Sequence, residues 1–358
     1  MDGMMKVLIA MSGGVDSSVA AKLLCDEGCE CIGCTMKLYD NCDAGLPRSR
    51  TCCSLDDVED ARSVAFSLGM RYYVFNFKDD FREKVIKKFA SGYLRGQTPN
   101  PCIDCNRYMK FDKLLERAKL LGCDKLATGH YARIEFDGEK YRLKKALDKS
   151  KDQSYVLYML TQEQLAHTLF PLGSLHKTDT RAIADAADLS SARKQDSQDI
   201  CFVPDGDYAA AIERLTGEKA PCGDFIDASG KILGTHRGIT HYTVGQHRGL
   251  GLSLPERRYV CGIDAESGTV TLGGSDELYS STAEVHGFNW ISGETPSEPI
   301  RCTAKIRYRQ PEQPATAIAH KDGSITIQFD APQRAVTPGQ AAVLYDGDTV
   351  LGGGEIVR

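Results

Sequence analysis

The 358 residues, 42% hydrophobic and 26% charged, predict a globular protein of two or three domains, and no run of about 18 apolar residues suggests a membrane-spanning helix. The net charge of −5 argues only mildly against a nucleic-acid partner, because binding depends on local clusters of Lys and Arg. The 14 cysteines are expected to be buried thiols, metal ligands or reactive centres rather than a secreted disulfide scaffold, and the expected location is the cytoplasm.

Apolar, strand-like runs alternate with helical patterns over the N-terminal half of the chain. The predicted strands cover residues 6–11, 31–36, 71–77 and 123–127. One helix is predicted directly after the glycine-rich turn that follows the first strand, and three more are predicted over 54–69, 79–94 and 112–121. The helix over 54–69 is expected to begin with a capping box of Ser54 and Asp57. This alternation predicts an α/β fold in which a parallel sheet carries helices on both faces.

The pattern changes near Pro204. Residues 205–280 are rich in glycine and in loop signals, which predicts a small central domain. From Ser281 onward, alternating stretches such as SITIQF and AAVLY lie between turn signals and predict a small antiparallel β-barrel. The predicted domains are therefore 1–204, 205–280 and 281–358.

A basic run at 301–309 lies within the predicted barrel. Alternation along a strand would place its basic side chains on one face and Tyr308 on the other. The basic residues are Arg301, Lys305, Arg307 and Arg309, with no acidic residue among them. A solvated charged face is one interpretation, and contact with nucleic-acid phosphates is the other.

The sequence SGGVDSS at 12–18 lies between the first predicted strand and helix. Its glycines let several backbone N–H groups converge on one anion at the positive end of a helix, and its serines add donors. Asp16 is a candidate ligand for Mg²⁺ beside bound phosphates. Ligands of parallel sheets lie at the carboxyl ends of the strands, where we expect Met36 to pack on an adenine and Gly129 to admit a nucleotide. His130 is either a substrate contact or a structural histidine.

Two cysteines are candidates for covalent chemistry. Cys105 follows a proline-rich approach and precedes a predicted helix, whose N-terminus would stabilise a thiolate, as would Arg107 and Lys110. Cys201 lies in SQDICF, far along the chain, at the edge of the same predicted domain. Sequence alone does not establish that the two thiols meet.

The other cysteines have more ordinary interpretations. Cys31 and Cys34 have the CxxC spacing of a zinc site, as do Cys102 and Cys105, but the first pair falls on a predicted strand and would face opposite sides. We therefore expect no bound zinc. Small buried thiols are expected at Cys25, Cys123 and Cys302, whereas Cys42, Cys52 and Cys53 have no assigned role.

A series of motifs resembles the bacterial tRNA-specific 2-thiouridylase family, a branch of the PP-loop ATP pyrophosphatases. Between Met11 and Gly354 they are AMSGGVDSS, TPNPCIDCNRYMKF, ATGHYAR, KDQSY, DSQDICF, YTVGQHRGLG, RYRQ and VTPGQAAVLYDGDTVLGGG. The resemblance implies a PP-loop domain of the adenine nucleotide alpha hydrolase type, a central domain and a C-terminal barrel that contacts tRNA. It also implies that ATP adenylates the C2 oxygen of the wobble uridine in tRNAs for Lys, Glu and Gln. Persulfide sulfur from a cysteine desulfurase or a relay protein would then displace AMP, giving 2-thiouridine.

The resemblance also assigns residues by motif position. Cys201 would carry the persulfide, and Cys105 would attack it and leave a Cys105–Cys201 disulfide. The implied ATP contacts are Ala10, Met11, Ser12, Gly13, Gly14, Val15, Asp16, Ser17, Met36 and Gly129. The implied contacts to the target base are Asn100, Pro101 and Cys102, and those to the rest of the tRNA are His130, Lys151, Asp152, Gln153, Arg307, Tyr308 and Gln340.

The chain departs from the family pattern at Cys102, where the family often has Asp. A carboxylate there could serve as a general base, and Asp104, two residues further on, is expected to point elsewhere. Cys102, Cys105 and Cys201 together could alternatively hold an iron–sulfur cluster with one open site. Two other functions stay open: a PP-loop enzyme that delivers nitrogen to an adenylated carbonyl, and a sulfur-carrying tRNA-binding scaffold without catalysis.

Overall fold

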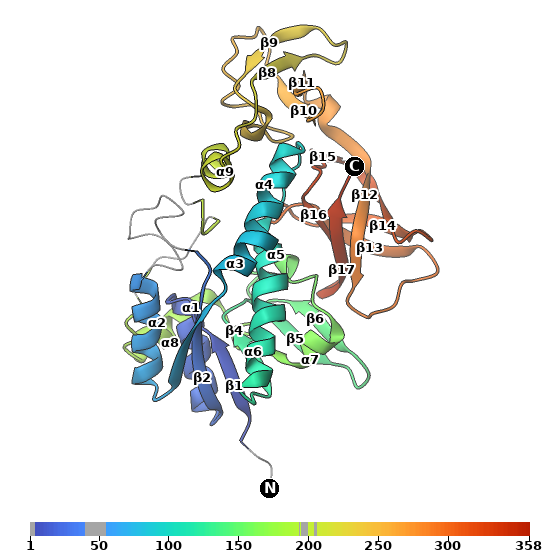
Figure 1. Cartoon of the computed structure of the whole chain (residues 1–358). Helices are drawn as coiled ribbons and strands as arrows, with labels where there is room; N and C mark the ends of the chain where they lie inside the picture. Colours follow the sequence, from blue (N-terminus) through green and yellow to red (C-terminus); the bar gives the residue numbers. More distant parts are fainter. Residues whose placement is uncertain (1–3, 40–54, 193, 195–199, 204–205) are drawn as a thin grey trace.

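The computed structural model describes residues 4–39, 55–192, 194, 200–203 and 206–358. Its N-terminal part contains a parallel sheet with the order β3-β2-β1-β4-β7, which confirms the predicted α/β fold (Figure 1). The strands are β1 (Lys6–Ala10), β2 (Glu30–Lys37), β3 (Arg71–Asn76), β4 (Lys125–Thr128) and β7 (Thr168–Leu169). Central strand β1 is apolar because both of its faces are covered by helices.

Side chains on the two faces of the parallel sheet belong to two separate hydrophobic clusters. Val7 and Ile9 of β1 pack with helices α1 (Val15–Asp26), α2 (Leu55–Ser67) and α8 (Lys177–Ala186). Leu8 points to the other face, where the cover consists of two long helical runs. One joins α3 (Lys78–Phe81), a π-helical segment Arg82–Ile86 and α4 (Lys87–Leu94); the other joins α5 (Pro101–Asp104), a π-helical segment Cys105–Leu114 and α6 (Leu115–Leu120).

The helix predicted over 112–121 is only the end of the second run, which begins at Pro101. Asn100 caps this run by accepting a hydrogen bond from the Cys102 amide at 3.1 Å, and Pro101 takes the first helical position. The prediction that Cys105 stands at a helix N-terminus is therefore wrong. Cys102 lies in the first turn, where the helix dipole acts, and Cys105 lies one turn further in.

The C-terminal part forms the predicted antiparallel barrel. Its strands are β12 (Tyr279–Trp290), β13 (Ile300–Lys305), β14 (Gln313–Ala319), β15 (Ile325–Arg334), β16 (Ala341–Asp346) and β17 (Thr349–Ile356). Pairing of β12 with β17, with Val285 opposite Ile356, closes the barrel and removes its open edges.

Between the two in the sequence, a smaller sheet with the order β10-β11-β8-β9 lies beyond the upper end of α4, at the top of Figure 1. Its strands are β8 (Gly223–Ile226), β9 (Ile232–His236), β10 (Tyr259–Asp264) and β11 (Thr269–Gly273), and helix α9 (Tyr208–Thr216) precedes them. None of the helices in the described ranges has the length and apolarity of a membrane span.

A β-hairpin that follows strand β4 of the parallel sheet pairs with the barrel. The sequence patterns did not predict this connection. Strands β5 (Ala132–Phe136) and β6 (Tyr141–Lys145) extend the barrel sheet through the pairing of Lys144 with Thr349. Short helix α7 (Gln162–Ala166) follows. Residues of both parts then share one core: the buried Tyr155 hydroxyl donates to the Ala341 carbonyl at 2.8 Å. The barrel is thus fixed directly against the helices that carry Cys105.

The basic run at 301–309 does not form one strand face, and that prediction is wrong. β13 ends at Lys305, and the chain turns over the next residues because Ile306 is drawn into the barrel core. Arg301 pairs with Asp330 on the surface. Arg307 instead turns inward, and its Nη2 donates to the carbonyls of Val244 at 3.0 Å and Ala335 at 3.3 Å and to Thr337 Oγ1.

Candidate functional site

The glycine-rich loop lies where β1 ends and α1 begins. Gly14 is the N-cap residue of α1, and it has no side chain to bond the amides of the first turn, which face the loop. Gly13 has φ +74°, and a Cβ there would lie 2.4 Å from the Asp57 carbonyl oxygen of α2. Glycine is therefore required at Gly13 both by its backbone conformation and by the close approach of α2. This arrangement fits an anion at the helix N-terminus.

Hydroxyl groups hold the loop in shape. The Ser17 hydroxyl donates to the Gly14 carbonyl at 3.1 Å and accepts from the Ser12 amide at 3.1 Å. The fully buried Ser18 donates to the same carbonyl at 2.9 Å and accepts from Ser191. Ser18 therefore stabilises the loop from inside, and the expectation that it donates to a phosphate is wrong.

The predicted ATP contacts outside the loop lie on the strands that flank β1. Ala10 pairs with Cys34 of β2 and with Thr128 of β4, so that Met36 and Gly129 both lie at the carboxyl edge of the sheet. A Cβ on Gly129 would lie 2.8 Å from the Ser17 backbone nitrogen. Gly129 is thus needed for the close packing of the β4 end against the loop itself.

Substituting Gly129→Ala is expected to lower the free energy of unfolding by about 1–3 kcal/mol, because the added methyl group meets backbone rather than a movable side chain. Displacement of the loop should also weaken nucleotide binding. Urea unfolding and equilibrium binding of ATP measure the two effects. Gly262→Ala is the control, since its Cβ would meet nothing closer than Thr271 at 3.9 Å. Equal behaviour of the two variants would contradict the argument.

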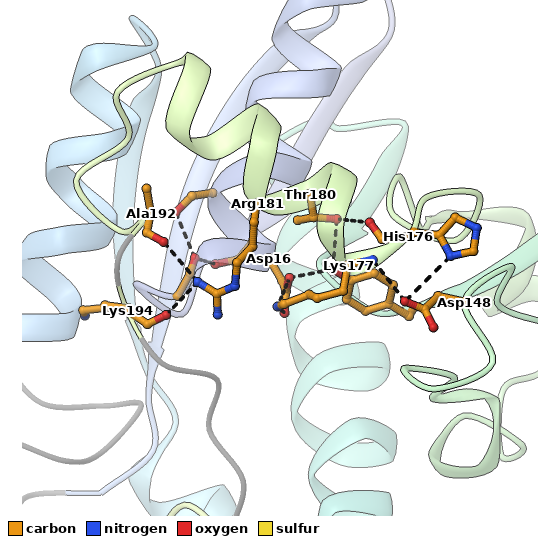
Figure 2. Close-up of polar contacts among 12 residues, drawn as sticks. Asp16, Asp148, His176, Lys177, Thr180, Arg181, Ala192 and Lys194 are labelled. Carbon is orange, nitrogen blue, oxygen red and sulfur yellow. Dashed lines mark hydrogen bonds and ion pairs between the residues drawn. The ribbon is translucent and has the colours of Figure 1, made fainter.

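Asp16 is the centre of a polar network that sequence analysis missed (Figure 2). Its carboxylate oxygens accept hydrogen bonds from Lys177 Nζ at 2.7 and 2.8 Å, and one of them accepts from the Tyr131 hydroxyl at 2.8 Å. The Thr180 hydroxyl lies 3.0 Å from that of Tyr131. Lys177 is the first residue of α8, and no local pattern links it to a loop 161 positions earlier.

The segment that leads to Cys201 is attached to the helices around the loop. Lys194 Nζ pairs with Asp57 Oδ1 at 2.7 Å and with Asp60, both on α2. From α8, Arg181 Nη1 donates to the carbonyls of Ala192 and Lys194, each at 3.1 Å (Figure 2). The chain just before the Cys201 motif is thereby fixed to the same elements that shape the nucleotide loop.

Cys105 and Cys201 pack against the same hydrophobic cluster, on the face of the sheet covered by α3 to α6. Tyr39, which follows β2, donates its hydroxyl to the Cys201 carbonyl at 2.8 Å. Phe202 then packs edge-on against Phe89, with ring centroids 5.4 Å apart. Cys105 opens the π-helical segment, a feature that is frequent at functional sites. Both predicted reactive cysteines therefore lie on this face of the sheet, and their meeting stays a prediction.

The segment expected to meet the target base is held by the barrel. Thr98 donates its amide to the Pro338 carbonyl at 2.8 Å and accepts at its own carbonyl from the Gln340 side chain. Cys102 is exposed on the following turn. Tyr308 is also exposed, and Lys305 Nζ lies 5.7 Å from its ring centroid. Gln340 of the barrel therefore lies beside the segment expected to meet the target base, and a tRNA surface shared with Tyr308 stays a prediction.

Asp104 points away from Cys102, as expected. It is buried and pairs with Lys88 Nζ at 2.8 Å. Burial raises the pKa of its carboxyl group, and the nearby Lys88 ammonium opposes this shift. Asp104 therefore does not take the place of the carboxylate that the family resemblance implies at the Cys102 position.

Asp152, Gln153 and His130, predicted to contact tRNA, make internal contacts in this structure. Asp152 accepts from the Ala146 amide at 2.9 Å, and Gln153 Oε1 accepts from the Tyr131 amide at 3.0 Å. His130 is buried, with Nδ1 2.7 Å from Thr128 Oγ1. These contacts give each residue a structural role, and their contact with tRNA stays a prediction, as does that of Lys151.

Burial and, secondarily, the Lys110 ammonium hold the pKa of His130 well below its ordinary value. The unfolded chain takes up a proton below about pH 6.5 whereas the folded chain does not, so this stabilisation is complete above that pH and is lost as the pH falls. His130→Gln should therefore weaken the fall of unfolding free energy below pH 6.5 by about 1.4 kcal/mol per pH unit. Urea unfolding between pH 5 and 8 measures it, with the exposed His286→Gln as control. Parallel pH curves for wild type and His130→Gln would contradict the assignment.

The remaining cysteines show no metal centre in the part of the chain that the structure describes, where no group of three His, Cys, Asp or Glu residues is arranged as ligands. Cys31 and Cys34 belong to clusters on opposite faces of the sheet, as predicted. Cys123 and Cys302 are buried, whereas Cys25 is only partly buried. Ser54, Cys42, Cys52 and Cys53 lie outside the described residues.

The fold and the loop define a class: a HUP-type α/β protein with a glycine-rich loop at its sheet edge, extended by two barrel-type modules. The tRNA methyl transferase HUP domain family matches residues 5–205, the tRNA methyl transferase PRC-barrel domain family 211–274, and the aminomethyltransferase beta-barrel domain family 280–356.

Curated relatives match the chain over nearly its full length. The tRNA-specific 2-thiouridylase MnmA of Acetivibrio thermocellus is 51% identical over 354 residues, covering 98% of this chain and 99% of that protein. The MnmA of Clostridioides difficile is 48% identical over 355 residues, covering 99% and 98%. The chain belongs to the tRNA-specific 2-thiouridylase family.

Proposed function

We propose that this chain is an ATP-dependent tRNA-uridine 2-sulfurtransferase that forms 2-thiouridine at the wobble position of tRNAs for Lys, Glu and Gln. One observation carries the proposal: the segment before Cys201 is bonded by Lys194 and Arg181 to the helices around the glycine loop. Helices α2 and α8 thus hold both the glycine loop and the residues shortly before Cys201, the proposed persulfide carrier. The full-length similarity to 2-thiouridylases supports the same chemistry.

The first step takes place at the loop. Amides at the N-terminus of α1 bind the phosphates of ATP, Met36 packs on the adenine, and Asp16 would hold the Mg²⁺ that offsets the phosphate charge. The C2 oxygen of uridine attacks the α-phosphorus, pyrophosphate leaves, and the oxygen becomes part of an AMP leaving group. Asn100, Pro101 and Cys102 would hold the base at the start of the helix that carries Cys105.

The second step transfers sulfur. Cys201 receives a terminal sulfur from a cysteine desulfurase or a relay protein and becomes a persulfide. The Cys105 thiolate attacks the Sγ atom of Cys201, a Cys105–Cys201 disulfide forms, and the terminal sulfur leaves as hydrosulfide. Hydrosulfide attacks C2 and AMP leaves with the oxygen. A thiol reductant must then return two electrons to the disulfide before the next cycle.

We further propose that the three segments 1–204, 205–280 and 281–358 act as catalytic, central and tRNA-contacting units of a cytoplasmic enzyme. The barrel contributes Tyr308 and Gln340 near the target-base segment, where Gln340 already bonds to Thr98. Arg307 has internal bonds that support the shape of this surface. Direct phosphate contact by Arg307 stays a prediction.

Release of pyrophosphate that depends on both tRNA and this chain tests the proposed function. We expect release only with substrate tRNA, and formation of AMP in equal amount when a persulfide donor is also supplied. Binding of tRNA and ATP without pyrophosphate release would instead indicate a non-catalytic scaffold. Full activity of a Cys105→Ala variant would favour an amidating PP-loop enzyme, which needs an ammonia source and no paired cysteines.

A further inference from the structure

The ion pair between Lys177 and Asp16 joins the first turn of α8 to the first turn of α1, directly at the nucleotide loop (Figure 2). We propose that Lys177 is a phosphate-binding residue, which pairs with Asp16 when no nucleotide is bound and moves to the β- and γ-phosphates of ATP. It would then stay with the pyrophosphate that leaves. This inference rests on the proposed function and deepens it.

On this proposal Asp16 is a temporary partner of Lys177, which a phosphate replaces when the nucleotide binds. Lys177 Nζ bonds both carboxylate oxygens, at 2.7 and 2.8 Å, as a bound cation would. The Lys177 side chain is 12% exposed and that of Asp16 33%, so the pair lies at the surface of the loop rather than in the core. An ammonium group with a flexible stem can exchange one oxyanion for another without movement of the backbone.

The neighbouring cations have partners that belong to the scaffold. Lys194 pairs with two carboxylates of α2, and Arg181, one turn after Lys177 on α8, donates to two main-chain carbonyls. Moving either would break the bonds that hold Ala192 and Lys194 to α8 and α2. Lys177 bonds the side chain of Asp16, and exchange of that bond requires no movement of the main chain.

Electrostatics favours the exchange. A triphosphate brings several negative charges to a loop that already contains a carboxylate, and the attraction between opposite charges is strong where water is partly excluded. When the ammonium moves to phosphate oxygens, Asp16 becomes available to the divalent cation that accompanies the nucleotide. The Tyr131 hydroxyl, bonded to Asp16 at 2.8 Å, keeps the carboxylate in place during this change.

The test compares the affinities of Lys177→Met and wild type for ATP and for AMP, by equilibrium binding in the presence of Mg²⁺. We expect ATP affinity to fall at least about tenfold and AMP affinity to change less than about twofold, because AMP lacks the phosphates in question. Lys22→Met removes a charge from the far end of α1, where Lys22 pairs with Asp26, and should leave both affinities unchanged. Lys177→Arg should recover part of the lost ATP affinity.

A second pair of variants distinguishes direct contact of Lys177 with the phosphates from mere neutralisation of the Asp16 charge by Lys177. In an Asp16→Asn background the carboxylate no longer repels phosphate, so Lys177→Met should still lower ATP affinity if Lys177 contacts the phosphates. No effect of Lys177→Met in that background, or an equal loss of ATP and AMP affinity, would overturn the proposal. Lys177→Gln with the same measurements replaces Lys177→Met if the latter does not fold. Wild-type protein that fails to bind ATP would instead overturn the proposed function itself.

Discussion

Replacing Cys105 or Cys201 with serine is expected to reduce 2-thiouridine formation by at least about 1,000-fold, because a hydroxyl group neither carries a persulfide nor attacks one at neutral pH. ATP binding should change little, since both cysteines pack against the cluster on the α3–α6 face and belong to no part of the loop. Mass spectrometry of nucleosides from tRNA treated with purified protein, ATP and a persulfide donor measures the loss.

The two variants should fail at different steps. Cys201→Ser should not accept sulfur, whereas Cys105→Ser should accept it and retain a persulfide on Cys201 that intact-protein mass spectrometry detects. Cys222→Ser, at an exposed cysteine of the central part, is the matched control and should retain full activity. Wild-type 2-thiouridine formation by Cys105→Ser would contradict the proposed transfer step.

Arg307→Met is expected to lower the free energy of unfolding by about 2–4 kcal/mol, because it removes the donor to the Val244 carbonyl and to the Thr337 hydroxyl. It also removes one of the two donors to the Ala335 carbonyl, which keeps its bond from Thr337. These bonds join the turn after β13 to the central part of the chain and to the residues after β15. Urea unfolding measures the change, and a lower midpoint with an unchanged slope is expected.

Arg301→Met removes the same charge from β13, six residues earlier. Arg301 pairs with Asp330 at the exposed surface, where ion pairs contribute little, so this variant should unfold close to wild type. If Arg307→Met were as stable as Arg301→Met but bound tRNA more weakly, Arg307 would be a tRNA contact rather than an internal support. That result would contradict the structural role assigned here.

Sequence patterns predicted the features that depend on local order. Alternation of strands and helices predicted the parallel sheet, and glycines after β1 predicted the loop, since Gly13 needs a positive φ. Alternation in the last part predicted the barrel. The start of the Cys105 helix was missed, although Asn100-Pro101 is itself a cap followed by a favourable first position. The proline-rich stretch before it obscured that signal.

Other features could not be predicted because they arise only from tertiary packing. Lys177 reaches Asp16 across 161 positions, and nothing in the sequence around Lys177 distinguishes it from other surface lysines. The hairpin of β5 and β6 lies within the predicted N-terminal domain in the sequence, but in the structure β6 pairs with β17 of the barrel. Arg307 appeared to continue an exposed strand because the turn after Lys305 depends on burial of Ile306.

The most direct test of the central claim is mass spectrometry of tRNA nucleosides from cells that lack this protein. The wobble uridine of tRNAs for Lys, Glu and Gln should lose its 2-thio group, and a plasmid with the wild-type gene should restore it where one with Cys201→Ser does not. Undiminished 2-thiouridine in those tRNAs, or restoration by the Cys201→Ser gene, would contradict the account.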